Sequence, residues 1–289
     1  MTATRFPLLL ALAIIGGFLP LVHHGGAAEF QVLTNVLYKP DAALTDYERE
    51  RCRLDLVVPT GRTNFATLVW FHGGGLTGGS KSVKFATQLA QALGVAVATV
   101  NYRLSPRATY PAYIEDAAAG VAWVHGHISG HGGNTNLIFV GGHSAGAYLS
   151  FMVGLDLRHL ARHRLDGSSL AGLIPVSGQT MTHFTVREER GLPKDRVIVD
   201  EAAPIFHVRK ETPPMLVIMG DRDWPARAEE NQYFVALLRA AGNGRVTYQQ
   251  FENRNHGTIG SKIVETGDPA GAAIRKFIAA CSADRAGNR

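Results

Sequence analysis

One serine in the sequence has the neighbours that would make it a nucleophile. Ser144 stands in Gly142-His143-Ser144-Ala145-Gly146, after the apolar run 137–140 and before a helical pattern over residues 145–155. A sharp turn from a strand into a helix exposes such a hydroxyl, and glycines on either side remove side chains that would clash. The positive end of the helix dipole would face the reacting centre. We therefore predict that Ser144 attacks an electrophilic carbon.

A serine hydroxyl is a weak nucleophile and needs a base, which a third group must orient. Where serine occupies a turn of this kind, the chain order is serine, acid, histidine. His256 is the only histidine beyond residue 223, and it lies between Asn255 and Gly257 on a predicted loop after the strand 246–251. Alone it would be taken for a surface residue; with Ser144 present we predict that it is the base.

Two aspartates compete for the role of the orienting acid. Asp221 and Asp223 both follow the strand 215–219, in Gly220-Asp221-Arg222-Asp223. Residues two apart share one face of an extended chain, so their spacing does not separate them. We choose Asp223, because the acid usually lies a few residues beyond the strand end, after a glycine, and we keep Asp221 as the alternative. The acid would hold the imidazole in one tautomer and stabilise its cation.

A glycine-rich stretch supplies candidate donors for an oxyanion. Phe71-His72-Gly73-Gly74-Gly75 ends the predicted strand 67–71. Without side chains, backbone N–H groups approach a negative oxygen closely, so we assign the N–H groups of Gly73, Gly74 and Ala145 to an oxyanion hole. A phosphate-binding loop is disfavoured, because neither Gly-Lys-Ser/Thr nor dinucleotide-binding spacing is present. We expect His72 to hydrogen-bond this loop and shape it, not to bind a metal.

These residues need a scaffold, and the chain alternates strands with helices. The central strands are apolar throughout, as expected when helices cover both faces of a sheet. This predicts an α/β fold with a doubly wound, mostly parallel eight-stranded sheet, in which the first two strands form an antiparallel edge. The predicted strands span residues 32–38, 53–58, 67–71, 95–100, 136–140, 173–176, 215–219 and 246–251, and the predicted helices 83–93, 113–124, 145–155, 229–241 and 270–280.

One stretch breaks this rhythm. Residues 177–208 are polar, charged and without clear periodicity, and they lie between two strands. Long connections in compact domains are usually functional, so we predict a small cap segment over the site; the alternative is a plain connection.

For two pairs of residues, the sequence leaves open whether they interact. Arg103 and Asp116 either form an internal ion pair or lie exposed. Cys52 and Cys281 are the only cysteines, and they either form a disulfide or stay free and buried, because sequence does not give the Cβ geometry.

The N-terminus resembles an export signal. Arg5 precedes the uncharged apolar stretch 7–21, and small residues follow at 25–28. Cleavage after Ala28 would leave a hydrolytic domain over residues 29–289. The stretch is short for a spanning helix, which needs roughly 20 residues, although an uncleaved anchor is the alternative. We expect a periplasmic or secreted protein with no stable membrane association after cleavage.

Composition narrows the partners. The net charge of +5 comes from basic residues scattered along a chain that is 46% apolar, which is globular and argues against a nucleic-acid partner. No metal-ligand spacing and no cofactor motif is present, so we expect neither metal nor cofactor.

Taken together, these motifs resemble the hormone-sensitive-lipase-like and bacterial carboxylesterase branch of the α/β-hydrolases. The loop 72–75, the stretch 101–104, the turn 142–146, Asp223 and His256 match in order, and the likeness runs from about residue 32 to the C-terminus. The run 70–80 (Trp-Phe-His-Gly-Gly-Gly-Leu-Thr-Gly-Gly-Ser) looks particularly similar to secreted acetylxylan and feruloyl esterases.

The resemblance implies a serine carboxylic-ester hydrolase that forms an acyl-enzyme. Short-acyl or carbohydrate-linked esters (acetyl or feruloyl) are the implied substrates. Larger lipases of this branch have a longer N-terminal cap, so the resemblance implies a smaller lid and modest substrates here. An arylformamidase is the alternative, since the turn 142–147 is also similar to that family. A third hypothesis is a non-catalytic binding module on a hydrolase scaffold.

Overall fold

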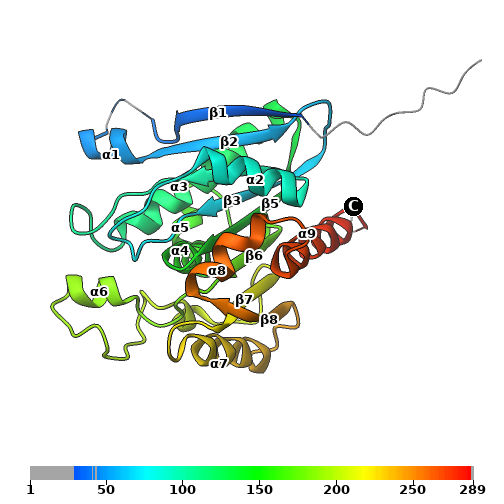
Figure 1. Ribbon diagram of the computed structural model, residues 1–289. Helices are drawn as coiled ribbons and strands as arrows, with labels where there is room; N and C mark the ends of the chain where they lie inside the picture. Colours follow the sequence, from blue (N-terminus) through cyan, green and yellow to red (C-terminus); the bar gives the residue numbers. More distant parts are fainter. Residues whose placement is uncertain (1–28, 41, 43, 288–289) are drawn as a thin grey trace, which may run out of the picture.

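The computed structural model describes residues 29–40, 42 and 44–287. Its centre is one sheet in the order β1-β2-β4-β3-β5-β6-β7-β8, which confirms the predicted eight strands (Figure 1). β2 is antiparallel to both β1 and β4, and the remaining neighbours are parallel, so the predicted antiparallel edge is present. The strands are β1 (Phe30–Leu37), β2 (Arg53–Pro59), β3 (Phe65–Phe71), β4 (Ala96–Val100), β5 (Gly133–His143), β6 (Gly172–Val176), β7 (Met215–Arg222) and β8 (Val246–Asn255).

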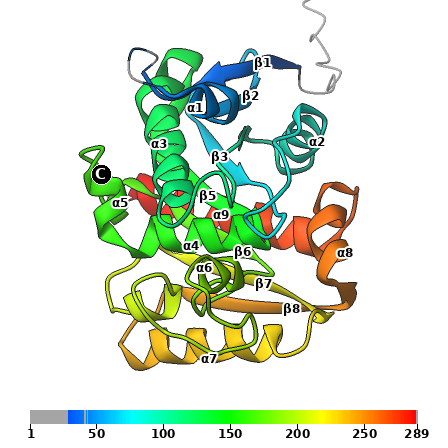
Figure 2. The same ribbon diagram turned by 90° about the vertical axis from the view of Figure 1, so that its left-hand side faces the viewer.

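Helices cover both faces of the sheet, because β3, β4 and β6 are buried along their whole length. Side chains of α3, α4 and α7 pack on one face, and those of α2, α8 and α9 on the other. Figure 2 shows where these helices lie around the sheet. The helices are α1 (Asp46–Arg51), α2 (Val83–Leu93), α3 (Ala112–His127), α4 (Ala145–Leu155), α5 (Leu157–Ala161), α6 (Phe184–Glu189), α7 (Arg227–Ala240), α8 (His256–Ser261) and α9 (Pro269–Gly287), with 3₁₀ turns at Ile128–His131, Gly167–Ser169, Pro204–His207 and Lys262–Val264.

The predicted strands and long helices are present; α2 and α4 have the predicted bounds, and the ends of the others are shifted. The short helices α1, α5, α6 and α8 were not predicted. Each spans six residues or fewer, which is less than two turns and too short for an apolar periodicity to show. One consequence is local to the site: the prediction of a loop at His256 was wrong, because this residue begins α8.

The two cysteines lie on opposite faces of the sheet and are free. Cys52 packs in the core layer with α3 and α4, whereas Cys281 packs in the layer with α2 and α9. A disulfide between them would have to pass through the sheet. Of the two possibilities that the sequence left open, the structure therefore has two buried, free thiols.

The predicted signal segment, residues 1–28, lies outside the described residues. Within them, no helix has both the length and the apolar character that crossing a membrane requires.

Candidate active site

The turn that holds Ser144 joins β5 to α4. Ser144 has φ +56° and ψ −118°, a backbone conformation that L residues rarely adopt, and its N–H donates to Val176 O at 2.9 Å. A Cβ at Gly142 would lie 2.5 Å from Gly146 C, and one at Gly146 would collide with Phe71 O. Both glycines are therefore required for the tight turn, as predicted. Every residue of α4 is buried, so this helix is fixed beneath the turn.

The structure brings Ser144, His256 and Asp223 together from three strand ends. His256 Nε2 lies 2.9 Å from Ser144 Oγ, and His256 Nδ1 lies 2.8 Å from Asp223 Oδ1. These are hydrogen-bond distances, in the arrangement of a nucleophile, a base and the acid that orients the base.

The competing aspartate faces elsewhere. Asp221 is exposed, and its Oδ1 accepts the backbone N–H of Arg254 at 2.9 Å, so it ties β7 to β8. Among the described residues it forms no hydrogen bond with the imidazole of His256. Asp223 lies one residue beyond the end of β7, with its side chain only 2% exposed. Burial disfavours its charged form, but hydrogen bonds from His256, Ser177 and the N–H of Trp224 outweigh burial and hold the pKa of Asp223 below its usual range.

Ser177 is a site residue that the sequence reasoning missed, having placed it at the start of the cap. It follows β6 directly, has φ +58°, and is fully buried. Its hydroxyl donates to Asp223 Oδ2 and lies 2.9 Å from His256 Nδ1. The available signal was its position: β6 neighbours β5 in parallel, so the residue after β6 lies beside the residues after β5.

The backbone and ring of His256 are both held in place. Asn255 caps α8 by accepting the N–H of Thr258 at 2.9 Å, and His143 Nε2–H donates to the carbonyl of His256 at 2.6 Å. Burial lowers the pKa of His143 to about 4, so this ring is neutral near pH 7. The Trp224 ring stacks on the imidazole with centroids 3.6 Å apart, where its π-face would favour an imidazolium.

The predicted oxyanion loop lies against the serine. A Cβ at Gly73 would lie 3.3 Å from Ser144 Cβ, which places this backbone within contact distance of the turn. Among the described residues, neither the N–H of Gly73 nor that of Gly74 donates to another backbone group outside regular helices and strands. Ala145 begins α4, so its N–H has no intrahelical carbonyl partner. In the described part of the chain, no turn or loop hydrogen bond to the backbone occupies these three N–H groups.

His72 shapes this loop as predicted. Its Nδ1–H donates to Gly73 O at 2.7 Å, and its ring stacks on Tyr102 with centroids 4.4 Å apart. Burial lowers the pKa of His72 to about 4, so it is a neutral donor near pH 7.

Arg103 and Asp116 form the internal ion pair that the sequence left open. Arg103 Nε lies 2.8 Å from Asp116 Oδ2, and Lys39 Nζ lies 2.5 Å from Oδ1. Cys52 and Glu48 lie near the same carboxylate, in the one grouping of metal-ligand types found among the described residues. The two cations already neutralise Asp116, so this cluster supports the fold.

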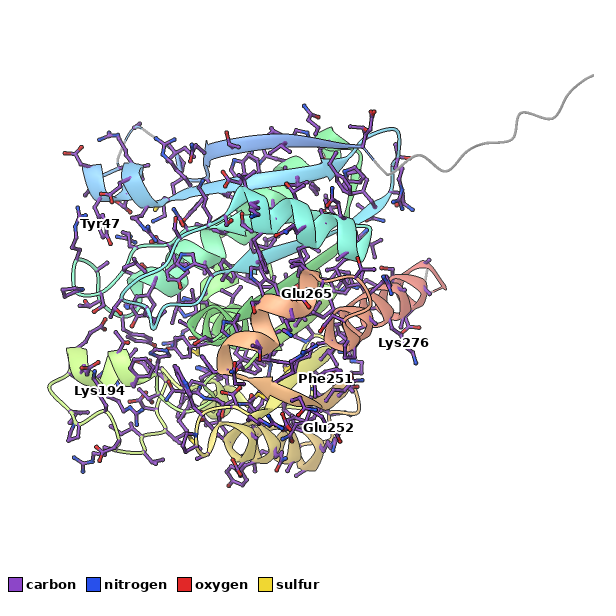
Figure 3. All side chains as sticks on the ribbon, viewed as in Figure 1. Tyr47, Lys194, Phe251, Glu252, Glu265 and Lys276 are labelled. Carbon is purple, nitrogen blue, oxygen red and sulfur yellow. The ribbon has the colours of Figure 1, made fainter. Side chains whose placement is uncertain are left out.

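Residues 177–208 fold back over the oxyanion loop. The hydroxyl of Thr185, on α6, donates to Gly75 O, and the Phe184 ring lies 3.1 Å from where a Cβ of Gly75 would be. The middle of the segment, around Lys194, reaches outward (Figure 3), whereas both ends are buried, as at Thr180 and Ala203. The segment therefore borders the site on the side of the glycine loop.

Comparison with known proteins identifies the family of the chain. A family profile described as alpha/beta hydrolase fold matches residues 68–260. Esterase LipC of Mycobacterium tuberculosis is 30% identical over 232 residues, which are 73% of this chain and 57% of LipC. Esterase LipQ of the same organism is 29% identical over 199 residues, 60% of this chain and 46% of LipQ. The chain thus spans about half the length of the curated relatives it matches.

Solved structures extend the likeness of the fold. A truncated carbohydrate esterase from gut microbiota superimposes with a TM-score of 0.71 at 19% identity, over 89% of this chain and 98% of that one. The resemblance to the hormone-sensitive-lipase-like and bacterial carboxylesterase branch is confirmed. The chain belongs to the α/β-hydrolase fold family, within a branch whose named relatives are esterases.

Proposed function

We propose that this protein is a serine carboxylesterase that works through an acyl-enzyme. The observation that supports this most strongly is the position of the His256 imidazole, within hydrogen-bond distance of both Ser144 Oγ and Asp223 Oδ1. That arrangement supplies a nucleophile, a general base and an orienting acid in one place.

Acylation would begin when His256 Nε2 takes the proton of Ser144 as Oγ attacks the ester carbonyl. The resulting oxyanion would accept hydrogen bonds from the N–H groups of Gly73, Gly74 and Ala145. Each such donor is typically worth about 3 kcal/mol of the barrier. The intermediate then collapses: the C–O bond to the alcohol breaks, and His256 gives its proton to the leaving oxygen.

Deacylation would repeat these steps with water as the nucleophile. His256 takes a proton from water, the hydroxide attacks the acyl carbon, and Ser144 leaves as its proton returns from the imidazole. Asp223 stabilises the imidazolium in both halves, which agrees with its lowered pKa. The nucleophile, the base, the acid and the oxyanion donors of this scheme are all groups of the chain.

Short-acyl or carbohydrate-linked esters, such as acetyl and feruloyl esters, are the substrates we favour. Residues 177–208 pack on Gly75 through Thr185, and we propose that this small cap limits the size of the acyl group. Two further predictions remain proposals: export of the protein, which depends on residues 1–28, and the absence of a nucleic-acid partner.

The test is hydrolysis of p-nitrophenyl acetate, butyrate and octanoate by the purified protein. We expect Ser144→Ala to lower kcat on the order of a millionfold, to background. The matched control is Ser150→Ala, because Ser150 is a buried serine of the same helix whose hydroxyl donates only to Ala147 O at 2.8 Å. Wild-type turnover by a folded Ser144→Ala protein would disprove the mechanism.

Two further measurements separate the alternatives. An arylformamidase would prefer N-formylkynurenine to acetyl esters, and a non-catalytic binding module would leave a fluorophosphonate probe unreacted. We expect the probe to label Ser144 and acetyl esters to be the better substrates.

A further inference from the structure

A buried arginine lies beside the catalytic residues without belonging to the triad. Arg227 is the first residue of α7, follows Asp223 closely in the chain, and is 8% exposed. Its Cζ lies 5.7 Å from the centroid of the Trp224 ring, and the same ring stacks on the His256 imidazole with centroids 3.6 Å apart. Trp224 therefore contacts both the guanidinium and the catalytic base.

This guanidinium has no counter-ion in direct contact. Within the residues that the structure describes, it donates no hydrogen bond and forms no ion pair of 4.0 Å or less. Other arginines of low exposure are paired, as Arg103 is with Asp116 and Arg254 with Asp268. Contact with an aromatic ring stabilises a cation but leaves its N–H donors unused. A charge withdrawn from water without a partner is costly, so Arg227 needs an explanation.

The carboxylates near Arg227 are engaged by other groups. Glu230 and Asp223 are the acids whose charges act on Arg227. Glu230 Oε1 accepts the backbone N–H groups of residues 180–181, and Asp223 Oδ1 lies 2.8 Å from His256 Nδ1. Burial outweighs the attraction of both acids and lowers the pKa of Arg227 from its usual value. The acids of the chain therefore leave this cation only partly compensated.

The proposed reaction does not itself need a cation at this place. His256 becomes an imidazolium in both halves of the reaction, and a neighbouring positive charge opposes that step. The charge of Arg227 does reach the site: after burial and the charge of His256, it is a further cause that lowers the pKa of His143 to about 4. A bound anion would neutralise Arg227 and remove this opposition, whereas a neutral substrate would not.

A ligand can reach the guanidinium. The buried nitrogens that have no hydrogen-bond partner and less than 1 Å² of accessible surface include Nε of Arg187 and Nε of Arg254, but no nitrogen of Arg227. Because the nitrogens of Arg227 also lack partners, each of them keeps accessible surface. Trp224, between Arg227 and the base, is 47% exposed. The molecule is therefore open on this side of the imidazole.

We propose that Arg227 binds a carboxylate carried by the alcohol part of the ester. His256 gives its proton to the leaving oxygen, so the groups attached to that oxygen lie beside the imidazole and Trp224. The acyl groups favoured above, acetyl and feruloyl, carry no charge. A planar guanidinium binds a carboxylate through two parallel N–H donors. This assignment rests on the proposed esterase function and adds a substrate class to it, the short-acyl esters of hydroxy acids.

The first experiment compares two esters that differ in charge. 4-Acetoxybenzoate has a carboxylate where 4-acetoxybenzamide has a neutral amide of similar shape. We expect Arg227→Met to lower the ratio of kcat/KM for the benzoate over the benzamide about thirtyfold, the value of a charge-assisted pair. Arg227→Lys keeps the charge but not the two parallel donors, so it should lower the ratio less. Loss of folded protein reduces both activities equally and leaves the ratio unchanged.

The matched control is Arg239→Met. Arg239 is an exposed residue in the last turn of the same helix, so this variant removes the same charge from the opposite end of α7. We expect its ratio to equal that of the wild type. An unchanged ratio in Arg227→Met, or equal effects of the two variants, would overturn the carboxylate site.

The second experiment measures binding without turnover. Both esters are titrated by calorimetry into the Ser144→Ala protein, where adding Arg227→Met should raise the Kd of 4-acetoxybenzoate about thirtyfold and that of the benzamide much less. If p-nitrophenyl acetate is hydrolysed but Arg227→Met changes neither the ratio nor the Kd, the carboxylate site is wrong and the esterase function stands. If no ester is hydrolysed, the esterase function is wrong, and the Kd values still decide whether Arg227 binds the carboxylate.

Discussion

Ser177 holds the carboxylate oxygen of Asp223 that does not face His256. Its hydroxyl donates to Asp223 Oδ2, while Oδ1 faces the imidazole at 2.8 Å. A carboxylate that is held at one oxygen cannot rotate freely about its Cβ–Cγ bond, so the other oxygen stays directed at His256 Nδ1. Ser177 is therefore placed to act on the reaction through Asp223, as a positioning residue.

We predict that Ser177→Ala lowers kcat about tenfold and leaves KM unchanged. The lost hydrogen bond is worth about 1.5 kcal/mol, and it supports the imidazolium more than the bound substrate. Ser177→Gly removes the same hydroxyl and also relieves the strain at φ +58°, so it should be the more stable variant and yet equally slow. Steady-state kinetics with p-nitrophenyl acetate gives both constants, and wild-type kcat in the glycine variant would show that the hydroxyl has no such role.

For individual site residues, the sequence was most informative where the order of residues along the chain left a single candidate. Ser144 and His256 followed from a motif and from the position of a single histidine. Asp221 and Asp223 did not separate, because two residues in an extended chain share a face. They differ in space since Asp221 Oδ1 accepts the N–H of Arg254 across the β7–β8 pair, and such a partner cannot be read from local spacing. Ser177 was missed for the same reason.

Among the elements, β3 and β5 matter most to the site. Their parallel register pairs Phe71 with Gly142, so the glycine loop after β3 lies beside the turn after β5. Gly146, in the first turn of α4, lets that helix approach the end of β3, where an added Cβ would overlap Phe71 O and lie 2.8 Å from His72 O. Backbone atoms of a central strand cannot move aside for one methyl group.

We expect Gly146→Ala to destabilise the protein by about 3 kcal/mol or more, and to abolish esterase activity by displacing the turn. The control is Gly126→Ala in α3, where an added Cβ would meet nothing within 4 Å. At this exposed position near the end of α3, alanine should stabilise the protein by about 1 kcal/mol. Urea unfolding and p-nitrophenyl acetate hydrolysis measure both effects. Equal stability of the two variants would contradict the close approach of α4 to β3.

The elements that sequence patterns predicted are those with a strong period. Buried strands such as β4 appear as continuous apolar runs, and helices of eleven residues or more, such as α2, show an apolar face. Helix α8 was not predicted, because it is only six residues long and begins at His256 itself. Its start depends on a capping box between Asn255 and Thr258, a signal that becomes informative only once the end of β8 is known.

For the molecule as a whole, the sheet separates two core layers, and each layer holds one thiol. Cys52 is fully buried and Cys281 is 7% exposed, and burial raises the pKa of each thiol to about 11. Both thiols are therefore protonated and shielded near neutral pH, which makes them unreactive.

We predict that a thiol reagent such as dithionitrobenzoate reacts with neither cysteine in the folded protein and with both in guanidinium chloride. A reducing agent should leave the melting temperature unchanged, because no disulfide contributes to the fold. Single Cys→Ala variants assign each reactive thiol in the denatured chain. A melting temperature that falls on reduction would show that the two layers are linked after all.

The pH dependence of global stability follows from histidines whose pKa is lowered in the folded protein. Burial lowers the pKa of His183 well below 6.5, and partial burial also lowers that of His163. Burial lowers the pKa of His72 and of His143 from 6.5 to about 4. Below pH 6.5 the unfolded chain binds protons at these rings and the folded protein does not. The contribution of these rings to the free energy of unfolding is therefore fully present above about pH 6.5, and it is lost as the pH falls toward 4. The loss amounts to on the order of 2–3 kcal/mol for each of His72 and His143. Asp223 does not contribute to the change in stability over this pH range. Its pKa is lowered from the usual carboxyl value, so its titration affects stability at lower pH.

We therefore expect the free energy of unfolding, measured in urea at pH 7, 6, 5 and 4.5, to fall steadily below pH 6.5. His72→Gln removes one of these titrating rings, so its stability should depend less steeply on pH than that of the wild type, even if the variant is less stable at pH 7. The control is His127→Gln, since His127 is an exposed residue at the end of α3, and its pH dependence should match the wild type. A wild-type stability that stays constant between pH 7 and 4.5 would mean that these rings take up protons in the folded protein as readily as in the unfolded chain, and His143 would then not stay neutral beneath His256 at low pH.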